Sequence, residues 1–107
     1  MMDKRLIERE LLLSALDEDA VLSAAENLLE KTGADVNEVL AFACRLAEDG
    51  FLEFYKYADD QAPVVIGPEE ILTEIRDEPY GVFLQQTDAT AGRLAILSQD
   101  GDGPVSA

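Results

Sequence analysis

The sequence contains no histidine and a single cysteine, Cys44. Without histidine there is no imidazole base, so neither a Ser–His–Asp triad nor a Cys–His pair can form. One cysteine excludes a disulfide within the chain, which makes the cytoplasm the expected compartment. Long apolar runs are also missing, because none approaches the ~18–20 residues that span a bilayer. We therefore expect a cytoplasmic protein that does not enter the membrane.

Basic residues are scarce. Only 8 residues are lysine or arginine, against 23 aspartates and glutamates, which gives a formal net charge of −15. Proteins that bind nucleic acids or anionic membranes normally rely on lysine and arginine to displace counterions, so this charge disfavours both partners. The acidity is equally explained by solubility, by adaptation to a salt-rich environment, or by recognition of a basic partner.

The remaining composition is that of a globular protein, with 48% hydrophobic and 29% charged residues among 107 positions. A chain of this length holds one core rather than two. We expect one domain over residues 1–98 and a loose tail over residues 99–107, because the tail has nothing to bury.

Three helical patterns occupy the first half of the chain, over residues 3–16, 20–32 and from 35 to the glycine at position 50. In the first, the spacing predicts a buried face and an outer face that includes Glu8. Asp19 is the expected cap of the second helix, and Asp35 begins the third. The residues expected to be buried are Leu6, Leu13 and Leu16 with Ile7 and Leu12 beside them, then Val21, Leu22, Ala25, Leu28, Leu29, Val36, Val39, Leu40, Ala43, Leu46 and Ala47.

The outer face of the third helix carries an aromatic ring among charges. Glu38, Phe42, Arg45, Glu48 and Asp49 share this face. A solvated helix does not need an aromatic ring, which leaves two interpretations. Either the ring packs against a neighbouring element, or it anchors a protein interface.

Short strands dominate the second half. We predict strands over residues 51–57, 64–66 and 82–87, with the second pairing back on the first. Tyr55 and Tyr57 are expected on the outer face of the first strand, with the same two interpretations as the phenylalanine. Pro68–Asp77 is predicted to form a short helix with Ile71, Leu72 and Ile75 on its apolar side, and a weak helical pattern follows at residues 93–97.

Two segments carry a resemblance to a known family. They are VLAFACRLAEDGFLEFY, residues 39–55, and VFLQQTDATAGRLAIL, residues 82–97. With the preceding helices they resemble the winged helix-turn-helix domain of bacterial transcription regulators, over about residues 6–96. The resemblance implies an α+β, winged-helix-like fold, with three N-terminal helices followed by a β-wing that here contains an inserted short helix. In that family the third helix reads the DNA major groove.

The DNA-reading residues of the family do not carry over. Its third helix presents arginine, lysine, serine, asparagine or glutamine to bases and phosphates, and here only Asn37 and Arg45 have that chemistry. Four acidic residues against one arginine give a formal charge of −3 between Asp35 and Asp49. We expect no direct DNA binding by this face.

The sequence therefore predicts a small acidic winged-helix protein that acts through protein–protein interaction, as an inhibitor, an immunity protein or a nucleic-acid mimic. The expected partner is a basic protein, such as a nuclease, a toxin or a DNA-binding protein. The expected partner-binding residues are Glu38, Phe42, Arg45, Glu48, Asp49, Asp59 and Asp60. The main alternative is a transcriptional regulator or dimerising accessory domain in which Lys4, Arg5 and Arg9 contact DNA, and a homodimer stays open. A third possibility is a structural subunit whose acidity is only an adaptation to its environment.

We expect neither catalysis nor a cofactor. Carboxylate pairs such as Asp59 and Asp60 could act as acid and base, but such pairs arise by chance in an acidic chain. Cys44 is expected to be a packing residue. The motif DGDG at Asp100–Gly103 resembles part of a calcium loop but lacks the third oxygen position and the closing glutamate, so we expect no metal.

Overall fold

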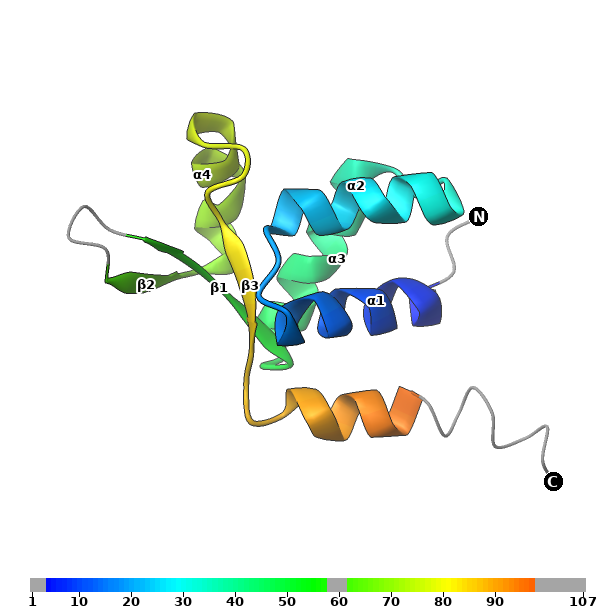
Figure 1. Cartoon of the computed structure of the whole chain (residues 1–107). Helices are drawn as coiled ribbons and strands as arrows, with labels where there is room; N and C mark the ends of the chain where they lie inside the picture. The colour runs from blue at the N-terminus through cyan, green and yellow to red at the C-terminus, as the bar shows by residue number, and fades with distance from the viewer. Residues whose placement is uncertain (1–3, 58–61, 98–107) are drawn as a thin grey trace, which may run out of the picture.

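The computed structural model describes residues 4–57 and 62–97 (Figure 1). Three helices come first, α1 (Lys4–Leu16), α2 (Val21–Thr32) and α3 (Val36–Glu48). They are followed by β1 (Leu52–Tyr57), β2 (Pro63–Ile66), a 3-10 helix η1 (Pro68–Glu70), α4 (Ile71–Asp77) and β3 (Phe83–Gln86). A last helix covers residues 90–97. The chain has the predicted α+β fold in a winged-helix-like arrangement.

The three strands form one antiparallel sheet in the order β2-β1-β3. Tyr55 in the central strand lies opposite Val65 on one side and Phe83 on the other. An isolated bridge joins Phe83 to Ala20, between α1 and α2. Strands β1 and β3 pair with each other, but β2, η1 and α4 lie between them in the chain. The short helix is therefore inserted between strands of the sheet, as the sequence indicates.

Helix α3 begins where the sequence predicts. The Asp35 carboxylate accepts a hydrogen bond from the Glu38 backbone N–H at 3.2 Å, which satisfies one of the donors left free in the first turn. After the last turn the chain reverses at Gly50, where φ is +84°. That conformation favours glycine because it has no Cβ.

Helix α2 does not begin as predicted. Its first flanking residue is Ala20, and no side chain caps it. Asp19 contributes its backbone carbonyl instead, which accepts a hydrogen bond from the Leu84 N–H at 2.9 Å. The expected cap was wrong because pairing with the sheet, rather than a local carboxylate, fixes the start of this helix.

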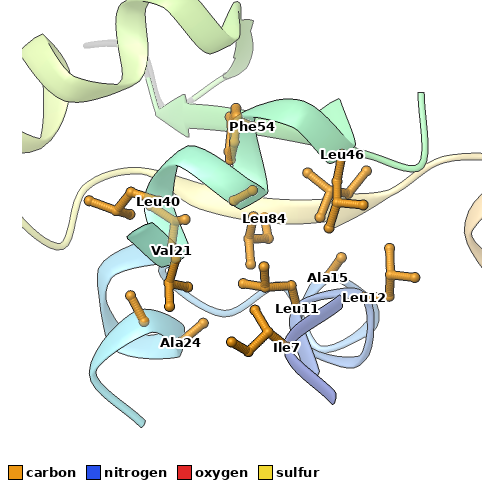
Figure 2. Close-up of a cluster of buried hydrophobic side chains, with 14 of the residues drawn as sticks. Ile7, Leu11, Leu12, Ala15, Val21, Ala24, Leu40, Leu46, Phe54 and Leu84 are labelled. Carbon is orange, nitrogen blue, oxygen red and sulfur yellow. The ribbon is translucent and has the colours of Figure 1, made fainter. Parts of the chain in front are cut away.

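The core lies between the helices and the inner face of the sheet (Figure 2). Phe54 and Leu84, which are opposite each other in the sheet, are fully buried. Leu40 and Leu46 of α3 and Leu11 of α1 belong to the same cluster. Because each such side chain stabilises the fold by about 1.5–3 kcal/mol when fully buried, this cluster is the main source of stability.

Helix α1 faces the core through a different stripe from the one predicted. Ile7, Leu11, Leu12 and Ala15 are fully buried, and the acidic Glu8 is only 6% exposed. The predicted Leu6, Leu13 and Leu16 are exposed to 36%, 38% and 39%. The prediction is confirmed for Ile7 and Leu12 and wrong for Leu6, Leu13 and Leu16, because apolar residues surround much of this helix and the side with Glu8 is covered by the helix 90–97.

Two other helices show smaller differences. In α2, Leu29 is exposed and Ala24 is buried in its place. In α4, Ile71 is buried as predicted but Leu72 is 57% exposed. The predicted buried stripe of α3 is confirmed for four of its six residues, Val39, Leu40, Ala43 and Leu46, while Val36 and Ala47 are half-buried.

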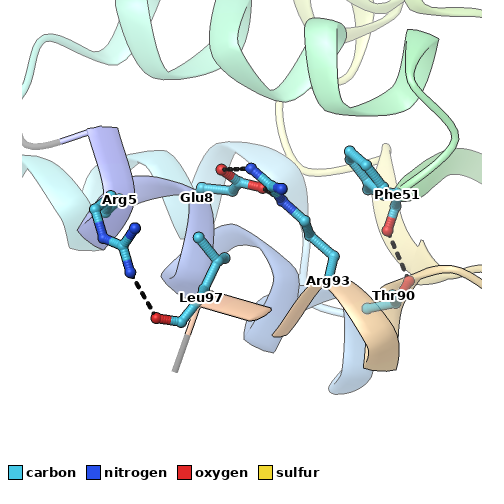
Figure 3. A network of polar contacts seen from close by, with 6 residues as sticks. All are labelled: Arg5, Glu8, Phe51, Thr90, Arg93 and Leu97. Carbon is cyan, nitrogen blue, oxygen red and sulfur yellow. Dashed lines mark hydrogen bonds and ion pairs between the residues drawn. The ribbon is translucent and has the colours of Figure 1, made fainter. Parts of the chain in front are cut away.

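Polar contacts hold the helix 90–97 against α1 and the start of β1 (Figure 3). The Arg5 guanidinium donates to the Leu97 carbonyl at 2.7 Å. Two nitrogens of Arg93 donate to the Glu8 carboxylate. The Thr90 hydroxyl donates to the Phe51 carbonyl at 2.7 Å. This helix, which the sequence indicates only weakly, is therefore an integral part of the fold.

Candidate functional site: the outer face of α3 and the adjoining groove

The outer face of α3 is acidic and exposed. Glu38, Arg45, Glu48 and Asp49 are all exposed, and Phe42 is half-buried. The buried stripe on the opposite side fixes the orientation of the helix, so the predicted facing of these residues is confirmed. The single basic residue of α3 therefore stands among three exposed carboxylates.

Phe42 has two contacts that decide its interpretation. One side of the ring packs against the core cluster. The Arg45 guanidinium lies over the ring, 5.6 Å from its centroid, which is within range of a cation–π interaction worth about 0.5–1 kcal/mol at an exposed site. The packing interpretation is thus confirmed in part, while the ring also lines the groove described next.

A groove of about 220 Å³ opens beside this face. Its lining residues are Lys4, Glu8, Phe42, Arg45, Leu46, Asp49, Phe51 and Arg93. Arg93 lies 5.2 Å from the centroid of Phe51, so two arginine–phenylalanine pairs face the same hollow. The volume is below the ~300–1,000 Å³ of a typical small-molecule pocket, and it suits one or two side chains of a partner.

Three of the predicted site residues, Phe42, Arg45 and Asp49, meet at this groove. Leu46 of α3 lines it too, and the other lining residues come from α1, the turn before β1 and the helix 90–97. Glu8 and Arg93, for example, are 85 positions apart in the chain. No local sequence pattern could identify such a pair. Among the lining residues that were not predicted, only Phe51 could have been noticed in the sequence, because it is an aromatic residue directly after the glycine that ends α3.

The remaining predicted residues do not line the groove. Glu38 and Glu48 are exposed beside it on the same helix. Asp59 and Asp60 lie outside the described residues, so their position beside α3 remains a prediction.

Cys44 connects α3 to the inserted segment. Its thiol donates a weak hydrogen bond to the Pro68 carbonyl at 3.5 Å. Burial raises the pKa of the thiol, and the nearby charges of Glu48 and Glu69 raise it further. The half-buried sulfur is therefore poorly suited to act as a thiolate nucleophile.

The strand alternation predicts that Tyr55 lies exposed on the outer face of the sheet, and this prediction is wrong. It is 3% exposed, because its ring stacks on Phe83 at 5.4 Å and meets Tyr57 at 5.7 Å. Its hydroxyl donates to a Glu18 carboxylate oxygen at 2.8 Å. Burial, followed by this hydrogen bond, raises the pKa of Tyr55. Tyr57 is 56% exposed, as expected.

The basic residues of the alternative interpretation are dispersed. Arg5 is engaged with the Leu97 carbonyl, and Lys4 lines the groove. Arg9 is exposed on α1. Of the three, only Lys4 lies next to the outer face of α3, where it lines the groove with Arg45 and Asp49.

In the part of the chain that the structure describes, no three cysteine or carboxylate side chains are grouped to hold a metal ion. The motif Asp100–Gly103 lies outside that part. Within the same residues, no helix is both long and apolar enough to cross a membrane.

No protein-family model matches the chain, and neither a curated protein nor a solved structure matches it. The class of the molecule is therefore defined by its own architecture, an α+β fold with a winged-helix-like arrangement and an acidic outer face on α3.

Proposed function

We propose that this protein is a member of the winged-helix class that binds a basic protein surface rather than DNA, as an inhibitor, an immunity protein or a nucleic-acid mimic. One observation carries the proposal. The helix that reads DNA in the winged-helix family here exposes Glu38, Glu48 and Asp49. Its only basic residue, Arg45, lies over the ring of Phe42.

Electrostatics supports this choice of partner. A helix in the major groove approaches two phosphate strands, and three exposed carboxylates would be repelled by them. The same carboxylates attract a basic surface, and long-range attraction speeds the encounter of two proteins. The net charge of −15 acts in the same direction over the whole molecule.

The groove supplies the short-range part of the proposed interface. Phe42 and Phe51 give it apolar walls, and its charged lining residues carry both signs, with Glu8 and Asp49 acidic and Lys4, Arg45 and Arg93 basic. A partner side chain that enters the groove would be shielded from water by the rings and fixed by the polar groups. Interfaces of this kind concentrate binding energy in a small apolar centre surrounded by charge.

The test uses two variants with the same total charge. The face variant carries Glu38→Gln, Glu48→Gln and Asp49→Asn. The control removes three exposed carboxylates elsewhere, through the substitutions Asp17→Asn, Glu30→Gln and Asp88→Asn. The wild-type chain first captures partners from a DNase-treated lysate of the source cell. The purified partner is then measured against all three proteins by surface plasmon resonance at two ionic strengths.

We expect the face variant to associate about tenfold more slowly, with a flatter dependence on salt, and the control to behave like the wild type. Equal association rates for the two variants would contradict the proposed face. Loss of every captured protein on DNase treatment would instead favour the regulator.

Phe42→Ala tests the groove separately. We expect it to weaken binding by about 2 kcal/mol, mostly through faster dissociation. Because the ring also packs against the core, thermal melts must accompany the measurement, and Phe42→Leu serves as the better-packed control. Wild-type dissociation from a folded Phe42→Ala variant would show that the partner uses another face.

A further inference from the structure

One edge of the sheet, the outer edge of β3, is covered by another segment of the same chain. Beyond the Ala20–Phe83 bridge, the Leu84 N–H donates to the Asp19 carbonyl at 2.9 Å. The Val21 N–H donates to the Val82 carbonyl at 2.9 Å as well. The junction between α1 and α2 therefore occupies the outer edge of β3.

The opposite edge is formed by β2. Within residues 4–57 and 62–97, β2 pairs with β1 alone, so its outer edge has no strand partner. Val64 and Val65 are exposed to 42% and 58%. Figure 1 shows the β1–β2 hairpin extending away from α1 and α2. Soluble proteins usually protect such an edge with charged residues or proline, and β2 has only Pro63 at its first position.

One face of this edge is aromatic. Val65 lies opposite Tyr55 in the sheet, beside the exposed Tyr57. The carboxylates of Glu18 and Glu53 lie on the other side of β1, toward β3, where they accept hydrogen bonds from Tyr55 and Gln85. A ligand side chain on this face would meet apolar rings first.

The other face is acidic. Val64 lies opposite Lys56, whose ammonium forms an ion pair with Glu74 at 2.9 Å. The hydrogen bond to Glu74 and the charges of Glu70 and Asp77 raise the pKa of Lys56, so three carboxylates act on this one lysine. Over Pro68–Asp77, four carboxylates, those of Glu69, Glu70, Glu74 and Asp77, stand against one arginine, Arg76. A basic side chain beside Val64 would therefore be attracted to α4.

We propose that the outer edge of β2 binds an extended basic segment of a partner protein as a fourth strand. Backbone hydrogen bonds supply the main contact, and alternate side chains of the segment supply specificity. Lysine or arginine side chains fall on the side of Val64 and α4, and apolar side chains fall beside Val65 and Tyr57, within the usual reach of cross-strand pairs.

A second copy of this chain fits the edge less well. It would bring a further net charge of −15 and place like charges against the carboxylates of α4. The strand site is distinct from the outer face of α3, so it goes beyond the proposed function and can hold or fail independently of it.

The probe is an end-blocked, fluorescent peptide in which lysine alternates with valine, measured by anisotropy against the full chain. Two further peptides carry N-methyl groups, one on the lysines and the other on the valines, with charge unchanged. Because a strand pairs through alternate N–H groups, we expect at least one methylated peptide to bind about tenfold more weakly. We expect the Glu74→Gln and Asp77→Asn double variant to weaken the parent peptide about fivefold.

The face variant of α3 is the matched control, and we expect it to bind the peptide like the wild type. If both methylated peptides bound as tightly as the unmethylated parent, the proposal would be overturned, since only charge would then be recognised. Loss of binding in the face variant would assign the peptide to α3 instead. Self-association of the chain in sedimentation, abolished by Val65→Lys, would identify a second copy as the occupant and would also overturn it.

Discussion

Thr90→Val removes two hydrogen bonds while keeping the shape of a buried side chain. Thr90 is 0% exposed, and its hydroxyl donates to the Phe51 carbonyl at 2.7 Å. The same oxygen accepts a hydrogen bond from the Thr87 N–H at 2.8 Å. It therefore joins the end of the third strand, the start of the helix 90–97 and the turn before β1.

Valine leaves both backbone groups without this partner. An unsatisfied buried group costs about 1–3 kcal/mol, and partial access of water to the two backbone groups reduces the cost. We expect the free energy of unfolding to fall by about 2–3 kcal/mol. Thr90→Ser keeps the hydroxyl and loses one methyl group, which predicts a loss of about 1 kcal/mol.

Urea unfolding of the full chain, followed by circular dichroism, measures both variants. For a domain of this size the valine variant should also lower the Tm by about 10 °C. The reasoning is refuted if valine is tolerated as well as serine, because the hydroxyl would then contribute nothing to holding the last helix.

Three further tests concern the third helix, a buried tyrosine and the cysteine. Leu40→Asp should unfold the domain because it places a charge in the core, whereas Glu48→Ala should change stability by less than about 0.5 kcal/mol; equal melting curves would contradict the facing of α3. Because the pKa of Tyr55 is raised from its usual 10.0, the folded state keeps its proton while the unfolded chain loses it, so stability should fall as the pH rises above 10.0. In alkaline unfolding experiments Tyr55→Phe should flatten this fall more than Tyr57→Phe, which removes only a neighbour that helps to raise the pKa of Tyr55; an identical effect of the two substitutions would show that Tyr55 is not protected. Cys44, with its raised thiol pKa, should react about tenfold more slowly with a disulfide reagent at pH 8 than the urea-unfolded chain does, and equal rates would show an open thiol.

The parts of the fold that the sequence predicts are those with local causes. The Asp35 cap and Gly50 mark the ends of α3, because both act within one turn of the backbone. The strand periodicity is equally local, and it predicts that Leu52 and Phe54 face the core.

The parts that the sequence does not predict depend on contacts between distant segments. Glu8 is buried because Arg93 neutralises it from the other end of the chain. Tyr55 is buried because Phe83, in another strand, covers it. Helical spacing in α1 permits more than one apolar stripe, and the contacts of α1 with α2, α3, β3 and the helix 90–97 select between them.

The same distinction applies to the candidate site. The exposure of Glu38, Arg45, Glu48 and Asp49 follows from the period of one helix, and the structure confirms it. The groove does not follow from any one element, since three separate parts of the chain line it. Sequence reasoning therefore identifies the acidic face but not the hollow beside it.

Fluorescence anisotropy of a labelled DNA duplex, titrated with the full chain at low and at physiological salt, tests the central claim most directly. The exposed carboxylates of α3 and the net charge of −15 predict no measurable binding at physiological salt. A micromolar or tighter complex that weakens as salt is added would contradict the claim, because it would show the release of counterions by a surface that attracts phosphate.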